Sequence, residues 1–213
     1  MLAHEIKNPL ASICGSIEVL RENGSFSDIK SKKLVDVVFK ETERLQRILN
    51  EFLTFSEGST IKKEKLDIKH LLDEIILVLE NHSEIGNGKE LKFKYDDSQN
   101  YYALLDEDQF KQMIYNLVIN AAQAIENTGF ICISLSKKFY AEKHYIQIEV
   151  EDSGKGIPDE NKKNVFKPFF STRTKGMGLG LNVCTKISQN HGWDISLRDR
   201  KQGGTIFRIL IQQ

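Results

Sequence analysis

The apolar residues of the first 55 positions follow the seven-residue repeat of helices that pack side by side. In the first stretch they are separated by alternating steps of three and four, at Ala3, Ile6, Leu10, Ile13, Ile17 and Leu20. A second stretch keeps the same register, with Glu41 in the one missing position, at Leu34, Val38, Leu45, Ile48, Phe52 and Phe55. This repeat predicts two α-helices, each with one apolar seam.

The segment between these helices is short and polar. It reads "ENGSFSD" over 22–28, where Gly24 is a stop signal and Ser27 or Asp28 an N-cap. A short connection predicts an antiparallel hairpin, here over 1–57. Such a hairpin buries little surface alone, so we expect it to dimerise into a four-helix bundle. The alternative is that its apolar stripe packs against the rest of its own chain.

The periodicity changes after a linker that we expect at 58–66. Helical patterns over 68–80, 108–126 and 179–190 are interspersed with alternating, strand-like patterns over 91–95, 101–105, 130–137, 145–152, 193–199 and 205–211. The strands over 130–137 and 145–152 are expected to be adjacent. The sequence therefore predicts an α+β protein with a mixed second domain over 67–213.

Charge and composition exclude several classes of partner. Thirty acidic residues balance thirty basic ones, which gives no electrostatic argument for nucleic acid or a membrane surface. No apolar run approaches ~18 residues, the length that a membrane helix needs. Cys14, Cys132 and Cys184 form no CxxC pair, and we interpret them as buried thiols in a reducing compartment. We expect a cytoplasmic location, with no direct nucleic-acid partner and no membrane span.

The helix predicted over 108–126 carries amides at steps of four. Gln112, Asn116 and Asn120 are expected on one face, opposite an apolar side. Amide oxygens can bind Mg²⁺ that is already surrounded by phosphate, without adding negative charge. The alternative is a plain solvated face.

Two glycine-containing stretches follow. In "EDSGKGIP" over 151–158, Asp152 ends a strand, and its carboxylate could accept from an exocyclic amine such as that of adenine. Turns use the same residues, so this signal is weak alone. In "FKPFFSTRTKGMGLGL" over 166–181, alternating glycines precede a helix, where backbone N–H groups bind phosphate. Neither the Walker pattern nor the dinucleotide fingerprint is matched, which indicates a third type of nucleotide site.

Together these motifs resemble the cytoplasmic core of bacterial sensor histidine kinases. "HEIKNPL" (4–10) is similar to the phospho-acceptor box and "NLVINAAQAI" (116–125) to the asparagine box. "DSGKGIP" (152–158) and "GMGLGL" (176–181) resemble the two glycine boxes, with "FKPFF" (166–170) as the phenylalanine box. Three features look most like the nitrogen-regulation subgroup. They are the form of the first box, the stretch "DEDQFKQ" before the asparagine box, and the short lid "STRTK". Its members often serve enhancer-binding response regulators.

The resemblance implies a dimerising hairpin followed by a Bergerat-type (gyrase-like) ATP-binding α/β sandwich, with ATP and Mg²⁺ as cofactors. It implies that Asn120 is the Mg²⁺ ligand, with Asn116 close by, and that Asp152 binds adenine. The remaining residues that it assigns to the nucleotide are Gly154, Gly156, Ile157, Phe166, Arg173, Lys175, Gly176, Gly178, Leu179, Gly180, Leu181 and Thr205. Met177 departs from the family, which commonly has threonine or serine there.

The resemblance also implies autophosphorylation of His4 and transfer of the group to an aspartate of a response-regulator receiver domain. Ala3 and Ile6 point inward in the seam, so His4 and Asn8 share the outer face. A neutral imidazole can attack the γ-phosphate while Glu5 takes or holds the other ring proton. Pro9 lacks an N–H, which predicts a bend just after His4. Asn8 is implied in dephosphorylating the regulator; the alternative is a surface filler.

Two other functions remain open at this point. The ATP domain could be a conformational switch, as in related chaperone and topoisomerase ATPases, with the hairpin as a scaffold. The chain could also act mostly as a phosphatase. The presence of His4, Glu5 and the short lid argues against the switch, whereas the sequence does not set the balance between kinase and phosphatase.

Overall fold

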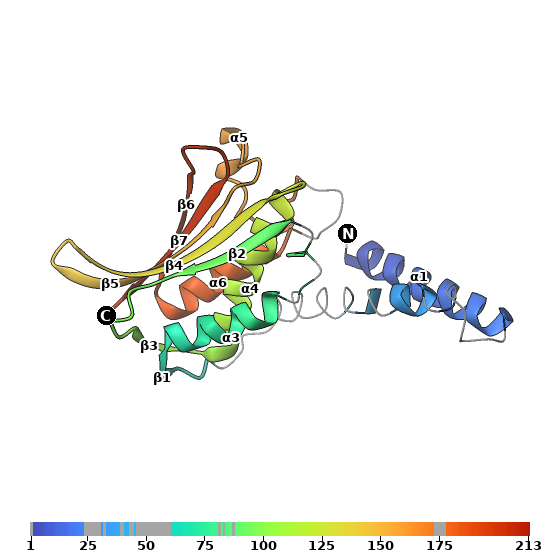
Figure 1. Ribbon diagram of the computed structural model, residues 1–213, viewed down its shortest axis with the longest axis horizontal. Helices are drawn as coiled ribbons and strands as arrows, with labels where there is room; N and C mark the ends of the chain where they lie inside the picture. Colours follow the sequence, from blue (N-terminus) through green and yellow to red (C-terminus); the bar gives the residue numbers. More distant parts are fainter. Residues whose placement is uncertain are drawn as a thin grey trace. The chain divides into compact units, whose positions relative to one another are not determined.

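The computed structural model describes residues 2–23, 31, 33–38, 41–42, 45, 61–80, 82, 84–86, 88–172 and 178–213 (Figure 1). The chain divides into two compact units. One comprises Met1–Ser59 with Ser171–Leu179, and the other Thr60–Phe170 with Gly180–Gln213.

The first unit begins with α1 (Leu2–Asn23), a helix that continues through Pro9. The described residues of the second predicted helix, which are Ser31, 33–38, 41–42 and 45, are also helical. Within this single chain Leu20 is buried, but Leu10 and Ile17 of the predicted seam are each 51% exposed. Cys14 is exposed as well, so the prediction that all cysteines are buried is wrong for it, whereas Cys132 and Cys184 are buried.

The second unit is built on a five-stranded sheet in the order β2-β4-β5-β7-β6. Its strands are β2 (Lys89–Lys94), β4 (Gly129–Tyr140), β5 (Lys143–Asp152), β6 (Asp194–Asp199) and β7 (Thr205–Gln212). The pair β2 and β4 is parallel and the other pairs are antiparallel. The predicted adjacency of the strands over 130–137 and 145–152 is confirmed, in the register Leu135 opposite Ile148.

A separate antiparallel pair joins β1 (Glu64–Asp67) to β3 (Tyr102–Leu105). The strand β1, which begins within the expected linker, is not predicted by the sequence pattern. Its four residues are too few to show an alternating pattern, and its partner lies far along the chain. The short helix α5 (Asp159–Lys162) was not predicted either.

The helices α3 (Ile68–Glu80), α4 (Glu107–Ala124) and α6 (Gly180–His191) cover one face of the five-stranded sheet (Figure 1). Between helices and sheet lies one apolar core, to which α4 contributes the fully buried Phe110, Met113, Ile114 and Leu117. The predicted α+β fold class is thus confirmed, because a helical element precedes a layered α/β unit. The helix boundaries agree with those expected to within one or two residues.

Candidate nucleotide-binding site

Asp152 and Thr205 are polar residues on the core face of the sheet. Along β5 the side chains of Ile146, Ile148 and Val150 are buried, and the two-residue period continues to Asp152, which is 1% exposed. On the neighbouring strand β7, the same alternation from Phe207 places Thr205 on this face, also buried. Two hydrogen-bonding groups therefore lie at one end of the sheet, beneath the helical layer.

The turn between β6 and β7 closes tightly over this end. Gly204 has φ = +105°, and a Cβ added to it would lie 1.9 Å from the carbonyl oxygen of Asp152. Only glycine allows the two backbones to approach so closely. Arg200 holds the turn: its Nε donates to Glu151 Oε1 at 2.6 Å and its Nη1 to the carbonyl of Gly203 at 3.1 Å.

The loop after Asp152 packs against the C-terminal end of α4. A Cβ on Gly154 would lie 2.5 Å from the carbonyl oxygen of Ala124, which accepts from the N–H of Lys155 at 3.3 Å. The N–H of Gly154 turns back to donate to Asp152 Oδ1 at 2.8 Å. Ser153 Oγ accepts from the N–H of Phe130 at 2.9 Å, which joins the loop to β4. The loop thereby brings Asp152 close to α4.

Asn116 and Asn120 lie where α4 faces the start of α6. Asn116 is 9% exposed, and its Nδ2 donates to the carbonyl of Gly180 at 3.4 Å. A Cβ on Gly180 would lie 3.6 Å from Asn120 Nδ2, so the side chain of Asn120 is adjacent. The amides of the asparagine box and the first residue of α6 therefore lie close together.

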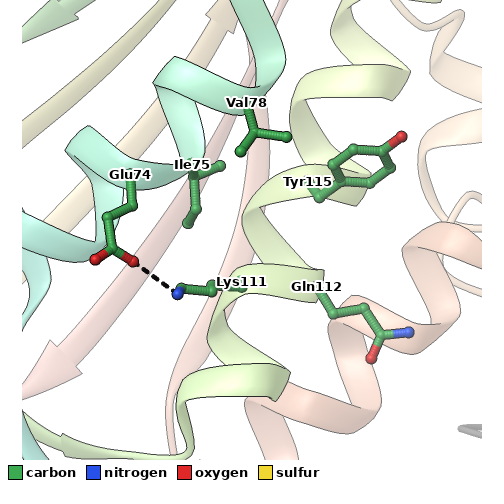
Figure 2. A pocket seen from close by; sticks show the side chains of 6 residues that line it. All are labelled: Glu74, Ile75, Val78, Lys111, Gln112 and Tyr115. Carbon is green, nitrogen blue, oxygen red and sulfur yellow. Dashed lines mark hydrogen bonds and ion pairs between the residues drawn. The ribbon is translucent and has the colours of Figure 1, made fainter. Parts of the chain in front are cut away.

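Gln112 lies one helical turn before Asn116 on α4. It lines a separate pocket of about 350 Å³ between α3 and α4, with Glu74, Ile75, Val78, Lys111 and Tyr115 (Figure 2). Four residues of α-helix advance the side chain by about 40° beyond a full turn, so positions 112 and 120 diverge by about 80°. The three amides therefore spread over about 80° of one side of the helix.

The remaining predicted residues fall into three groups. Ile157, Phe166 and Leu181 pack, partly buried, against the core, and the ring of Phe166 meets that of Phe207 edge-on at 6.2 Å. Gly178, with φ = +65°, and Leu179 directly precede α6, and Gly156 has φ = +75° beside the carbonyl of Gly204. His4, Glu5 and Asn8 lie in α1, whereas Arg173, Lys175 and Gly176 are outside the described residues.

The donor chemistry of this site fits Mg²⁺. Within the described ranges there is no cluster of three or more His, Cys, Asp or Glu side chains that could hold a metal. The polar groups beside the first turn of α6 are the amides of Asn116 and Asn120. Mg²⁺ usually retains several waters and binds through few protein oxygens together with substrate phosphates, which such a set allows.

Sequence reasoning missed Ser153, Arg200 and Gly204, all of which shape the end of the sheet. The doublet "GG" before "TIF" was a readable signal for a tight turn. For Arg200 no local signal exists, because its partner Glu151 lies on β5, 49 residues away.

Comparison with protein families places both parts of the chain. The model for histidine kinase-, DNA gyrase B-, and HSP90-like ATPases matches residues 105–213. The model for the His Kinase A (phospho-acceptor) domain matches residues 1–61. Within the described part of the chain, no helix is both long and apolar enough to cross a membrane.

Curated relatives match over nearly the whole chain. Sporulation kinase C of Bacillus subtilis is 29% identical over 211 residues, which are 99% of this chain and 47% of that protein. Sensory histidine kinase/phosphatase NtrB of Rhodobacter capsulatus is 33% identical over 98% of this chain and 59% of that protein. This chain spans between 33% and 47% of the length of the first relatives, sporulation kinases C and A of B. subtilis and sensor histidine kinase ZraS of Escherichia coli.

Solved structures of histidine kinases are similar to this chain. Histidine kinase ThkA in complex with response regulator protein TrrA has a TM-score of 0.74 at 28% identity, covering 99% of this chain and 59% of that chain. The catalytic domain of ThkA has a TM-score of 0.62 at 31% identity, covering 71% of this chain and 95% of that chain.

Proposed function

This chain belongs to the family of histidine kinase-, DNA gyrase B-, and HSP90-like ATPases and carries a phospho-acceptor domain before it, and from that premise we propose that it is a protein-histidine kinase core. It binds ATP, phosphorylates His4 and passes the phosphoryl group to an aspartate of a response regulator. The domains are proposed at 1–57 and 67–213, joined by 58–66. A cytoplasmic location is proposed with them.

The observation that carries the proposal is the convergence of three motifs far apart in sequence. Asp152 is buried at the end of β5, while Asn116 and Asn120 flank Gly180 at the start of α6. A buried carboxylate suits the adenine amine, and N–H groups at a helix N-terminus suit phosphate. One nucleotide can span both groups of contacts.

In the proposed site, Asp152 accepts from the adenine amine with Thr205 beside it. The glycine boxes, Ile157, Phe166, Leu179 and Leu181 line the nucleotide, and Arg173 and Lys175 approach its phosphates. Asn120 holds Mg²⁺ with Asn116 close by; the ion, when bound, neutralises charge on the phosphate oxygens. Catalysis of phosphoryl transfer then depends mainly on positioning and on charge stabilisation.

His4 is the proposed nucleophile. Neutral imidazole presents a lone pair, which forms the N–P bond as the bond from the γ-phosphorus to the bridging oxygen of ADP breaks. Glu5 holds or takes the proton on the other ring nitrogen, a role that typically contributes about 10²–10⁴-fold in rate. Asn8, one helical turn after His4, is proposed to orient a water against the phospho-aspartate of the regulator.

The partners proposed are a second copy of the chain, through the helical hairpin, and the receiver domain of a response regulator. A regulator of the enhancer-binding class is favoured by the motifs that resemble the nitrogen-regulation subgroup. The relative named NtrB supports this subgroup at 33% identity, and the sporulation kinases match comparably.

The first experiment incubates the protein with γ-labelled ATP and Mg²⁺ and scores acid-labile, base-stable label. We expect label on the wild type and on His70→Gln, a matched control at an exposed histidine of α3, and none on His4→Gln. Equal labelling of His4→Gln would refute the assignment of the acceptor. A wild type that binds ATP without acquiring label would favour the ATP-switch alternative.

The role of Asn8 is tested separately. We expect Asn8→Ala to label normally but to lose the dephosphorylation of a phosphorylated receiver domain. Unchanged dephosphorylation would remove Asn8 from the mechanism.

A further inference from the structure

Asp106 is the residue at which three segments of the second unit meet. It precedes α4 in an extended conformation (φ = −87°, ψ = 119°), and its Oδ1 accepts from the N–H of Gln109 at 3.1 Å. This contact is an ordinary N-cap, which satisfies a donor in the first turn of the helix. It uses only one of the two carboxylate oxygens.

The second oxygen holds the segment through which the chain enters this unit. Oδ2 of Asp106 accepts from the backbone N–H of Lys62 at 2.9 Å, across 44 residues of sequence. Residues 61–63 lie within the proposed linker over 58–66 and immediately before β1. The middle of the linker is thereby tied to the N-terminus of the helix that carries Asn116 and Asn120.

The main chain of Asp106 holds the end of α6. Its N–H donates to Nε2 of His191 at 3.0 Å, while Nδ1 of His191 bonds to the carbonyl of Ile187 at 2.9 Å. Trp193 stacks on His191 with ring centroids 4.3 Å apart and meets Phe110 of α4 edge-on at 6.2 Å. The ends of α4 and α6 remote from the nucleotide site therefore form one packed joint.

We propose that Asp106 is a positioning residue that couples the interdomain linker to the nucleotide-binding helices α4 and α6. The proposal rests on the kinase function and adds a device for its regulation. With Lys62 held, the chain carrying His4 enters the ATP-binding unit from a fixed point on α4. With Lys62 released, residues 61–63 lengthen the free linker, so the effective concentration of bound ATP at His4 falls.

Two substitutions separate this tether from the cap. Asp106→Asn keeps an oxygen for Gln109 but places an N–H₂ group where Lys62 needs an acceptor, and asparagine is as good an N-cap as aspartate. Lys62→Pro removes the donor itself. The matched controls are Glu107→Gln, the same chemical change one residue later, and Lys62→Ala, which keeps the N–H.

Hydrogen exchange of the Lys62 amide tests the tether without reference to activity. We expect slow exchange in the wild type and in Glu107→Gln, and fast exchange in Asp106→Asn. Equally fast exchange in the wild type and in Asp106→Asn would overturn the proposal, whether or not the protein is a kinase.

Autophosphorylation then tests the coupling. We expect both tether variants to label about 3- to 10-fold more slowly than wild type, with ATP affinity and melting temperature nearly unchanged. The double variant should be no slower than either single one, because both remove the same contact. Wild-type rates in the two single variants, or a slow rate explained by weakened ATP binding, would overturn the proposal. An unlabelled wild type with a protected Lys62 amide would refute the kinase function instead.

Discussion

At the scale of single residues, the site depends on polar groups placed where apolar ones would otherwise lie. Asp152 continues the buried phase of Ile146, Ile148 and Val150, yet its carboxylate accepts from Gly154 rather than remaining unsatisfied. Among the described residues, no buried side-chain nitrogen or oxygen lacks a hydrogen-bond partner. Burial of a polar group is costly unless it is satisfied, so the backbone around Asp152 is closely defined.

Gly204 is the position where the backbone around Asp152 leaves the least room for a side chain. We expect Gly204→Ala to cost about 3 kcal/mol of stability and to abolish ATP binding, because its Cβ would overlap the carbonyl oxygen of Asp152. Urea unfolding and nucleotide titration measure the two effects. The matched control is Gly192→Ala, also at positive φ (+71°) but with nothing within 4 Å of the new Cβ, which should cost only about 1 kcal/mol. Equal losses of unfolding free energy in the two variants would show that backbone strain, and not the contact with Asp152, sets the cost.

His191 makes the stability of the second unit depend on pH. Burial, the largest cause, lowers the pKa of His191 below its ordinary value of 6.5, since the imidazolium is poorly solvated there. The unfolded chain binds this proton more readily, so the stabilisation is present above pH 6.5 and is lost as pH falls below it. Neutral His191 is also the form whose Nε2 can accept from Asp106.

We therefore expect the wild type to exceed His191→Gln in unfolding free energy at about pH 7.5, with a smaller difference at about pH 5.5. Trp193, the single tryptophan of the chain, reports unfolding by its fluorescence. Because both proteins share the other histidines, the difference isolates position 191. A difference that is constant or grows on acidification would contradict the assignment.

At the scale of elements, local patterns predicted most helices and strands, and failed where the partner is remote or the element very short. The alternation in β5 and the apolar spacing in α4 are each readable from consecutive residues. The strand β1 has four residues and forms only against β3, and α5 has four residues on the surface. The pocket that Gln112 lines depends on the position of α3, which no pattern along α4 specifies.

The backbone at the tip of the β4–β5 hairpin is strained, and the sequence pattern does not predict this strain. Tyr140 pairs with Lys143, so Ala141 and Glu142 form a two-residue loop with φ = +49° and +61°. Such loops favour Asn-Gly, because positive φ strains other residues. We expect Ala141→Asn with Glu142→Gly to stabilise the protein by about 1 kcal/mol in urea unfolding. Glu142→Ala, which removes the charge but keeps the Cβ, should give no gain; an equal gain would point to charge instead.

At the scale of the whole molecule, the first unit leaves part of its apolar seam uncovered in the single chain. Leu10 and Ile17 of α1 are each 51% exposed. Exposed apolar residues in a heptad register fit a partner helix. This pattern supports the proposed homodimer.

Ile17→Lys should convert the protein from dimer to monomer in analytical ultracentrifugation, because a charge in the seam cannot be buried without a partner. The matched control is Glu18→Lys, one residue on and also exposed, which should remain dimeric. If both variants stayed dimeric, the seam of α1 would not be the interface. ATP binding, which we propose for the other unit, should be retained in both variants.

The sequence by itself determined the features that are encoded in neighbouring residues. These are the heptad register, the alternation in the strands, and the glycine and asparagine motifs with their order. These suffice for the α+β class and for the family resemblance, because each depends on local spacing. Only the tertiary structure decided which of these residues meet. Three such contacts are the approach of Gly204 to Asp152, the ion pair of Arg200 with Glu151, and the hydrogen bonds of Asp106 to Lys62 and His191. The partners in these contacts are separated by 44 to 85 positions in the sequence. Such contacts depend on the register of strands and the packing of helices, which no local pattern specifies.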